Sequence, residues 1–273
     1  MVNLLTSEQQ AAILAAMREC GAIIRNAHAV ESNAASIHVK PGSANFVTEY
    51  DVKVQEILIE KLSAILPEAA FFAEEKDNAA ETARQGLCFV IDPIDGTTNF
   101  IHDYKASSIS VGLLQDSEPV YGAVYDPYRD ELFTAFTGMG AYLNGERISV
   151  SNRPLALALV CFGASPYDKE KLAPASFALA KEVFMQCADI RRSGSAAIDM
   201  CGVACGRADA FFEPKLSPWD YMASAVIIKE AGGLLCRFNG EPVSFEKPNS
   251  VCCVNKAASE ELLKITTQFA ENQ

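Results

Sequence analysis

Two aspartates lie within four residues, directly after an apolar run. The run covers residues 87–91, and its β-branched and aromatic side chains predict a buried strand. Asp92 and Asp95 follow, separated by a proline that fixes the backbone and interrupts regular structure. Carboxylate oxygens are the ligands that Mg²⁺ prefers in proteins. The pattern therefore predicts a site for hard cations, and the alternative is a turn in which the aspartates only cap backbone N–H groups.

The residues after these aspartates have the chemistry to hold an anion. Gly96 allows a tight bend, and Thr97 and Thr98 offer hydroxyl and backbone N–H groups where we expect a helix to start. Helix N-termini bind phosphate and similar anions through such N–H groups. A strand end that holds cations beside a helix start that holds an anion predicts phosphate chemistry.

Further acids lie at the ends of other apolar segments. Asp51 comes just before the apolar stripe of a predicted helix, where by itself it reads as a helix-dipole acid off the apolar face. Glu74 follows a short aromatic strand, and Asp220 lies at a predicted helix N-terminus beside the only tryptophan. Carboxylates from four segments can converge only if metal ions neutralise their charge. We therefore expect one metal centre.

The elements that must position these acids can be read from the hydrophobic pattern. A capping box of Ser7 and Gln10 predicts the first helix, whose buried face carries Ile13, Met17, Cys20 and Ile24. A second helix should bury Val54, Leu58, Leu62 and Ile65 and end at Pro67. Strands are expected at residues 71–73, 107–114, 120–125 and 131–136, with a hairpin at Asn144-Gly145. Sequential hairpins indicate an antiparallel sheet covered on one face by the two helices.

The second half of the chain predicts alternating strands and helices. Strands are expected at residues 156–162 and 208–213, and helices at residues 174–184 and 197–205, the latter ending at Gly206. Small residues at 190–197 predict a strand-to-helix turn, and Gly232-Gly233 should end the helix that follows Asp220. We see no repeat or linker, so we expect one catalytic unit over residues 1–273, with lobes at 1–150 and 151–273.

Composition excludes several classes of function. The net charge of -12 argues against a nucleic-acid partner or an anionic membrane surface. The N-terminus lacks a signal-peptide pattern, and no segment approaches the roughly 20 apolar residues of a spanning helix. Nine cysteines without paired spacing indicate buried thiols in a reducing cytoplasm, and three scattered histidines do not make a zinc site.

Two longer motifs resemble the signatures of the inositol monophosphatase family. One is Asp-Pro-Ile-Asp-Gly-Thr-Thr-Asn-Phe at residues 92–100, and the other runs from Trp-Asp-Tyr-Met-Ala to Glu-Ala-Gly-Gly at residues 219–233. Residues 47–51, Glu74-Glu75 and Gly194-Ser195-Ala196 follow the family's order and spacing, so the resemblance covers nearly the whole chain. It implies an α+β fold, a layered αβαβα sandwich of the inositol monophosphatase and fructose-1,6-bisphosphatase type. It also implies a homodimer that hydrolyses phosphate monoesters with Mg²⁺ and is sensitive to Li⁺.

The resemblance also implies a role for each matching residue. Glu74, Asp92 and the Ile94 carbonyl would hold one Mg²⁺, and Asp92, Asp95 and Asp220 a second. Thr97, paired with Asp51, and Glu74 would orient and activate the attacking water. The substrate would contact Asp95, Gly96, Thr97, Gly194, Ala196, Glu213 and Asp220. Lys40 matches a mobile active-site loop that approaches a third, weaker metal.

The substrate is less firmly indicated than the reaction. Thr98-Asn99 favours inositol 1-phosphate, because relatives that act on nucleotide 3′-phosphates or histidinol phosphate tend to carry lysine there. A fructose-1,6-bisphosphatase is a further alternative, and Lys215, between two prolines, is a candidate contact for a second anionic group. A regulator that binds RNA or protein on this fold is the alternative from another class. The complete acid set argues against it.

Overall fold

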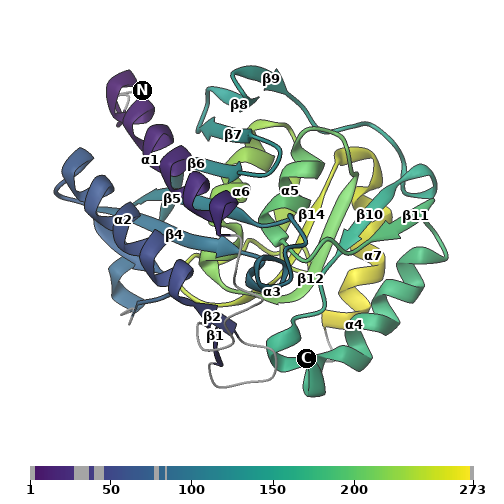
Figure 1. The fold of residues 1–273 in the computed structure, drawn as a ribbon. Coiled ribbons are helices and arrows are strands. Elements are labelled where there is room, and N and C mark those ends of the chain that lie inside the picture. The colour runs from purple at the N-terminus through teal and green to yellow at the C-terminus, as the bar shows by residue number, and fades with distance from the viewer. Residues whose placement is uncertain (1–3, 28–36, 40–45, 77–79, 84, 271–273) are drawn as a thin grey trace.

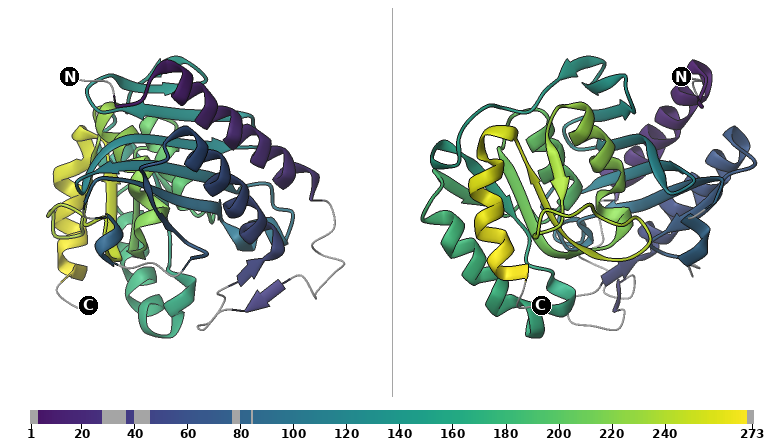
Figure 2. Two further views of the ribbon diagram at one scale, coloured as in Figure 1. Left: turned by 90° about the vertical axis from the view of Figure 1, so that its left-hand side faces the viewer. Right: turned by 180° about the vertical axis from the view of Figure 1, so that it is seen from behind.

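The fold consists of five alternating layers of helices and sheets (Figure 1, Figure 2). The computed structural model describes residues 4–27, 37–39, 46–76, 80–83 and 85–270. In order, the layers are α1 with α2, a seven-stranded sheet, α5 with α6, a five-stranded sheet, and α4 with α7. The αβαβα sandwich expected from the sequence is confirmed.

The outer helix pair consists of α1 (Ser7–Asn26) and α2 (Glu49–Ile65). The predicted buried face of α1 is confirmed, but its capping box is formed by Thr6 and Gln9, one residue earlier than predicted. In α2, Val54, Leu58 and Leu62 are fully buried against the sheet, and Ile65 only in part. A two-stranded antiparallel pair, β1 (Ile37–Val39) and β2 (Phe46–Thr48), precedes α2.

The first sheet has the strand order β3-β4-β5-β6-β7-β8-β9. Its strands are β3 (Ala70–Ala73), β4 (Leu87–Asp95), β5 (Ser108–Gln115), β6 (Glu118–Asp126), β7 (Glu131–Phe136), β8 (Gly140–Leu143) and β9 (Glu146–Ile148). Only β3 pairs in parallel, with β4, and the other neighbours are antiparallel, as the hairpin pattern predicts. The Asn144-Gly145 turn joins the last two strands.

The middle layer is formed by α5 (Ala196–Ala204) and α6 (Pro218–Glu230). Both helices are apolar on most sides, because a sheet covers each of their faces. The backbone of α6 lies close against β6: a Cβ atom on Gly122 would come within 2.2 Å of the Ala223 carbonyl oxygen. A glycine is therefore required where the helix crosses the strand.

The second sheet has the order β11-β10-β12-β14-β13. Its strands are β10 (Leu159–Phe162), β11 (Asp189–Arg191), β12 (Ala210–Leu216), β13 (Leu234–Cys236) and β14 (Asn249–Val254), and α4 (Lys169–Phe184) and α7 (Lys256–Ala270) cover its outer face. The strand predicted at 156–162 is shorter because Leu155–Leu157 form a 3₁₀ turn. The helix predicted from Pro174 begins five residues earlier, at Lys169, so Pro174 lies inside α4 and removes one of its backbone hydrogen bonds.

Three large apolar clusters hold the layers together. One cluster lies between the outer helix pair and the first sheet, one around α5 and α6, and one between the second sheet and α4 with α7. All nine cysteines are free thiols, and seven are buried. None of the described helices combines the length and apolar composition that a membrane crossing requires. The division into lobes at residue 150 stays a prediction.

Candidate active site

The end of β4 places both signature aspartates at one site. Contrary to the sequence expectation, Pro93 does not end the strand, which continues to Asp95. Positions three apart face opposite sides of a regular strand, but the pairing with β5 is irregular between Asp92 and Asp95. Both side chains are buried, and the Asp95 carboxylate raises the pKa of Asp92, so the irregularity brings them together.

A short helix presents Thr97 to this site. Gly96 adopts a φ of 88°, in the left-handed region, and α3 (Thr97–Ile101) begins directly after it. The Thr97 Oγ1 lies 3.3 Å from Asp51 Oδ1 and 3.2 Å from the Ile94 carbonyl oxygen. The hydroxyl thus lies between a carboxylate and the backbone of the signature.

Asp51 is not the exposed acid that its position near a helix start indicated. Its side chain is fully buried, and the Thr48 N–H and hydroxyl both donate to Oδ2, at 2.8 and 2.5 Å. Burial raises the pKa of Asp51 to about 6, although the hydrogen bonds from Thr48 lower it. This capping box fixes the carboxylate that faces Thr97.

Two more acids approach from separate elements. Asp220 is the third residue of α6, where Oδ2 accepts a hydrogen bond of 2.7 Å from the Ser217 N–H. Glu74 directly follows β3, and its N–H donates to the Ile91 carbonyl of β4 at 3.2 Å. Both side chains are half-buried. Segments from both halves of the chain therefore meet at the end of β4.

The acids repel one another. Burial is the largest cause of the raised pKa of Asp92, Asp95 and Asp220, and the charge of Glu74 raises the pKa of Asp92 and Asp220 further. In the described part of the chain, no three acidic, histidine or cysteine side chains form a ready-made metal cage. The donor set is nevertheless all oxygen, and mutual repulsion among buried carboxylates is relieved by a hard cation. The residues present fit Mg²⁺.

The N-terminus of α5 holds Asp95 in place. Ser195, the N-cap, donates its hydroxyl to Asp95 Oδ2, and the Ala197 N–H donates to the same oxygen at 2.8 Å. The Ala196 N–H donates to Oδ1 at 3.3 Å. Sequence reasoning placed Gly194 and Ala196 near the substrate but missed this anchoring role. A serine followed by two small residues at a predicted helix start was the available signal.

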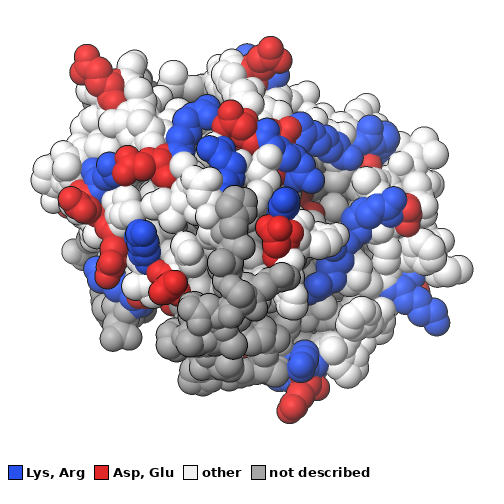
Figure 3. Space-filling view, in the orientation of Figure 1, with Lys and Arg blue, Asp and Glu red and all other residues white. Residues whose placement is uncertain are grey.

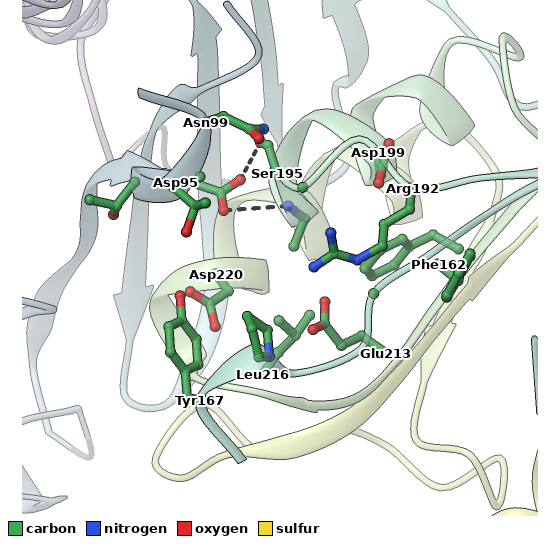
Figure 4. A pocket seen from close by; sticks show the side chains of 18 residues that line it. Asp95, Asn99, Phe162, Tyr167, Arg192, Ser195, Asp199, Glu213, Leu216 and Asp220 are labelled. Atoms are coloured by element: carbon green, nitrogen blue, oxygen red, sulfur yellow. Dashed lines mark hydrogen bonds between the residues drawn. The ribbon is translucent and has the colours of Figure 1, made fainter. Parts of the chain in front are cut away.

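A cavity opens beside these acids (Figure 4). The predicted substrate residues Asp95, Gly96, Thr97, Gly194, Ala196, Glu213 and Asp220 all line it. Glu213 Oε1 accepts a hydrogen bond of 2.8 Å from the Ser165 N–H, and burial raises the pKa of Glu213 to about 7. Sequence reasoning missed Phe162, Tyr167, Arg192 and Asp199, which also line the cavity. They come from a strand end, a 3₁₀ turn, a loop and a helix, and none of them belongs to a motif.

One predicted residue lies away from the cavity. Lys215 is exposed, forms an ion pair with Asp168 and does not line the cavity, so it is not placed to meet a second anionic group there. Alternation alone would put Lys215 on the same face as Glu213. The pairing of β12 with β14 is irregular between Glu213 and Leu216, so these two residues line the cavity while Lys215 is exposed. Lys40 lies outside the described residues.

The model of the inositol monophosphatase family matches residues 5–271. The chain belongs to this family. It is 38% identical over 221 residues to the Nus factor SuhB of Pasteurella multocida, which covers 81% of this chain and 82% of the relative. It is 39% identical over 208 residues to an inositol-1-monophosphatase of Synechocystis, covering 76% and 72% of the two chains.

Solved structures of the inositol monophosphatase family share the fold. The extragenic suppressor protein suhB of Bartonella henselae superimposes with a TM-score of 0.86 at 29% identity, over 96% of this chain and 99% of that chain. The resemblance inferred from residues 92–100 and 219–233 is thus confirmed over the whole chain. Membership supports a phosphatase of a family that generally depends on Mg²⁺.

Proposed function

We propose that this protein is a Mg²⁺-dependent phosphate monoester hydrolase that acts on inositol 1-phosphate. The observation that carries the proposal is that Asp95, Asp220 and the helix-terminal Thr97 line one cavity. Asp92 and Glu74 lie close enough for their charges to interact with these acids. Glu74, Asp92, the Ile94 carbonyl, Asp95 and Asp220 would hold two or three Mg²⁺ ions. When bound, Mg²⁺ lowers the pKa of coordinated water and neutralises phosphate charge.

Thr97 and Asp51 orient the attacking water. The Thr97 hydroxyl donates toward Asp51 or the Ile94 carbonyl, which leaves its lone pairs free to accept a hydrogen bond from a water molecule. Glu74 supports that water from the side of β3. The N–H groups of Gly96 and Thr97, at the start of α3, cradle the phosphate.

The alcohol half of the ester lies along the remaining cavity wall. Gly194 and Ala196 offer a close backbone surface, and Glu213 accepts hydrogen bonds from ring hydroxyls. The Thr98-Asn99 pair supports inositol 1-phosphate over nucleotide 3′-phosphates and histidinol phosphate, and fructose 1,6-bisphosphate is the further alternative. The relative from Synechocystis named an inositol-1-monophosphatase supports the same choice.

A regulatory role is a second candidate, favoured by relatives named Nus factors. Lys and Arg side chains gather over the upper right of one face, with Asp and Glu among them (Figure 3). The net charge of -12 therefore does not exclude a local contact with RNA or an acidic protein. The expectation of no nucleic-acid partner stays a prediction. A gel shift with RNA at low and high salt tests this expectation. RNA binding at low salt that is lost at high salt would favour the regulatory role.

The proposed activity is tested by phosphate release from four esters. These are inositol 1-phosphate, fructose 1,6-bisphosphate, adenosine 3′,5′-bisphosphate and histidinol phosphate, each with Mg²⁺ and with EDTA. We expect Mg²⁺-dependent turnover, best on inositol 1-phosphate and lost in Asp95→Asn. Glu260→Gln, an exposed acid on α7, is the control. Folded protein that releases no phosphate from any ester would overturn the proposal.

A further inference from the structure

Among the described residues that line the cavity, Arg192 is the only cationic one. It lies between β11 and α5, and its guanidinium points into the cavity toward Glu213 (Figure 4). The other basic side chains nearby are directed elsewhere or neutralised. Arg191 pairs with Asp189, and Lys215 with Asp168.

The Arg192 guanidinium has N–H donors available for a ligand. No carboxylate in the described part of the chain forms an ion pair with Arg192, although its charge acts on Glu213. A guanidinium offers five donors in a planar fork that matches a carboxylate or a phosphate. The free fork therefore faces the volume that a substrate enters.

The position of Arg192 decides which part of the substrate it meets. The scissile phosphate belongs at Gly96, Thr97 and the acids, so Arg192 faces the alcohol half. There the cavity is otherwise acidic, with Glu213 and the buried Asp199 in its wall. A neutral polyol needs only acceptors such as Glu213, whereas an anionic alcohol half would be repelled without a cation.

We infer that Arg192 is a specificity-determining residue that binds a second acidic group, a phosphate or a carboxylate, on the alcohol half of the ester. This inference rests on the proposed function and extends its substrate class to esters that carry such a group. The role that the sequence indicated for Lys215 passes to Arg192, because Arg192 reaches the cavity and Lys215 does not.

The test compares kcat/KM for fructose 1,6-bisphosphate with that for inositol 1-phosphate. Hydrogen bonds to charged groups contribute about 1.5–3 kcal/mol, so Arg192→Ala should lower the ratio of the two kcat/KM values about tenfold to a hundredfold, mainly through KM. Arg192→Lys keeps the charge without the fork and should restore part of the ratio. Arg191→Ala removes the adjacent charge outside this cavity and should leave the ratio unchanged. Arg192 is exposed, so its substitution spares the core.

The outcomes separate this inference from the proposed function. Equal losses on both esters in Arg192→Ala would overturn the inference while the phosphatase activity stands. If the bisphosphate is not hydrolysed, its inhibition constant against inositol 1-phosphate is measured instead, and a constant unchanged by Arg192→Ala overturns the inference. If no ester is hydrolysed, the proposed function fails. Calorimetric binding of fructose 1,6-bisphosphate with Mg²⁺ then tests Arg192 alone, and equal affinity in both proteins refutes its role.

Discussion

At the scale of single residues, Thr97 connects the buried Asp51 with the proposed metal site at the end of β4. Its hydroxyl lies between Asp51 and the Ile94 carbonyl, so it is positioned by a buried helix cap and by the metal-binding signature together. Asp51 in turn is fixed by Thr48. A water molecule that contacts Thr97 would therefore meet an oriented oxygen.

Thr97→Val keeps the side-chain shape and removes that oxygen. We expect kcat to fall about a hundredfold, the lower end of what a positioned proton-transfer group contributes, with a smaller change in KM. Thr137→Val is the matched control, because Thr137 lies in the turn between β7 and β8 and does not line the cavity. Steady-state kinetics on inositol 1-phosphate decide the matter, and similar losses in both variants would contradict a special role for Thr97.

Asp199 is a buried acid beside the cavity, and it lowers the stability of the folded protein by an amount that depends on pH. Burial raises its pKa from 3.8 to about 7, although hydrogen bonds from Ser193 and Cys161 lower it. The folded state therefore binds a proton that the unfolded state releases between these values, so this group reduces stability as pH rises from about 4 to about 7. A shift of that size corresponds to at most about 4 kcal/mol.

Asp199→Asn should therefore stabilise the protein above pH 7 and have little effect near pH 4. Denaturant unfolding at pH 8 and pH 5 measures the difference, and we expect the larger gain at pH 8. Asp189→Asn provides the comparison, because Asp189 is exposed and the hydrogen bond from Arg191 lowers its pKa, so no gain should appear at high pH. A gain for Asp199→Asn that is equal at both pH values would refute the argument.

At the scale of elements, the contact between α6 and β6 fixes where Asp220 lies. The helix begins with a capping box of Ser217 and Asp220, and its second turn crosses β6 at Gly122. The backbone approach there leaves no room for a side chain. The position of one of the proposed metal-binding acids thus depends on a glycine in a distant strand.

Gly122→Ala should destabilise the protein and reduce Mg²⁺ affinity together. The added Cβ would lie 2.2 Å from a backbone oxygen, so the helix must shift, at a cost of at least about 1–3 kcal/mol. Gly202→Ala in α5 is the control, since its nearest neighbour would be 4.0 Å away and alanine favours the helix. Thermal unfolding and Mg²⁺ titration test both variants. A Gly122→Ala protein with unchanged stability and Mg²⁺ affinity would show that the sheet moves to make room and the helix does not.

At the scale of the whole molecule, the site draws acids from both halves of the chain. Asp92 and Asp95 end a strand of the first sheet, whereas Asp220 begins a helix between the sheets. We propose that the two lobes form one unit and that cations bind at the junction between them. We also propose that the protein is a homodimer. Gel filtration with light scattering measures the latter, and a monomer at micromolar concentration would contradict it.

Mg²⁺ should raise the melting temperature, because it binds the folded state only. At a concentration of 100 Kd the stabilisation is about 2.7 kcal/mol, or roughly 5–10 °C for a domain of this size. Asp220→Asn should lose most of this increment yet melt higher than the parent without Mg²⁺, since one repelling carboxylate is gone. Glu260→Gln should keep the full increment. Equal increments in all three proteins would place the cation elsewhere.

The amino-acid sequence by itself indicated the reaction class, and its resemblance to the family implied the order of the layers. The acids stand at the ends of apolar segments, and the motifs at residues 92–100 and 219–233 have a fixed spacing. Both the position of the acids and the spacing of the motifs can be read from the sequence without the fold. Alternating and helical periodicities likewise indicated the antiparallel sheet and the two covering helices. Element ends were less accurate. Pro174 did not mark the start of α4, and a 3₁₀ turn at Leu155–Leu157 takes the place of the first residues predicted for β10.

Only the tertiary structure decided which polar side chains reach the cavity. Asp51 is buried and faces Thr97 because β4 and α2 pack together, and the irregular pairing of β4 with β5 brings Asp95 to the side of Asp92. Arg192 and Lys215 are both basic residues close to the motifs in the sequence, yet only Arg192 points into the cavity. Local patterns specify which face a residue occupies on its own element, whereas contacts between elements depend on how the layers pack.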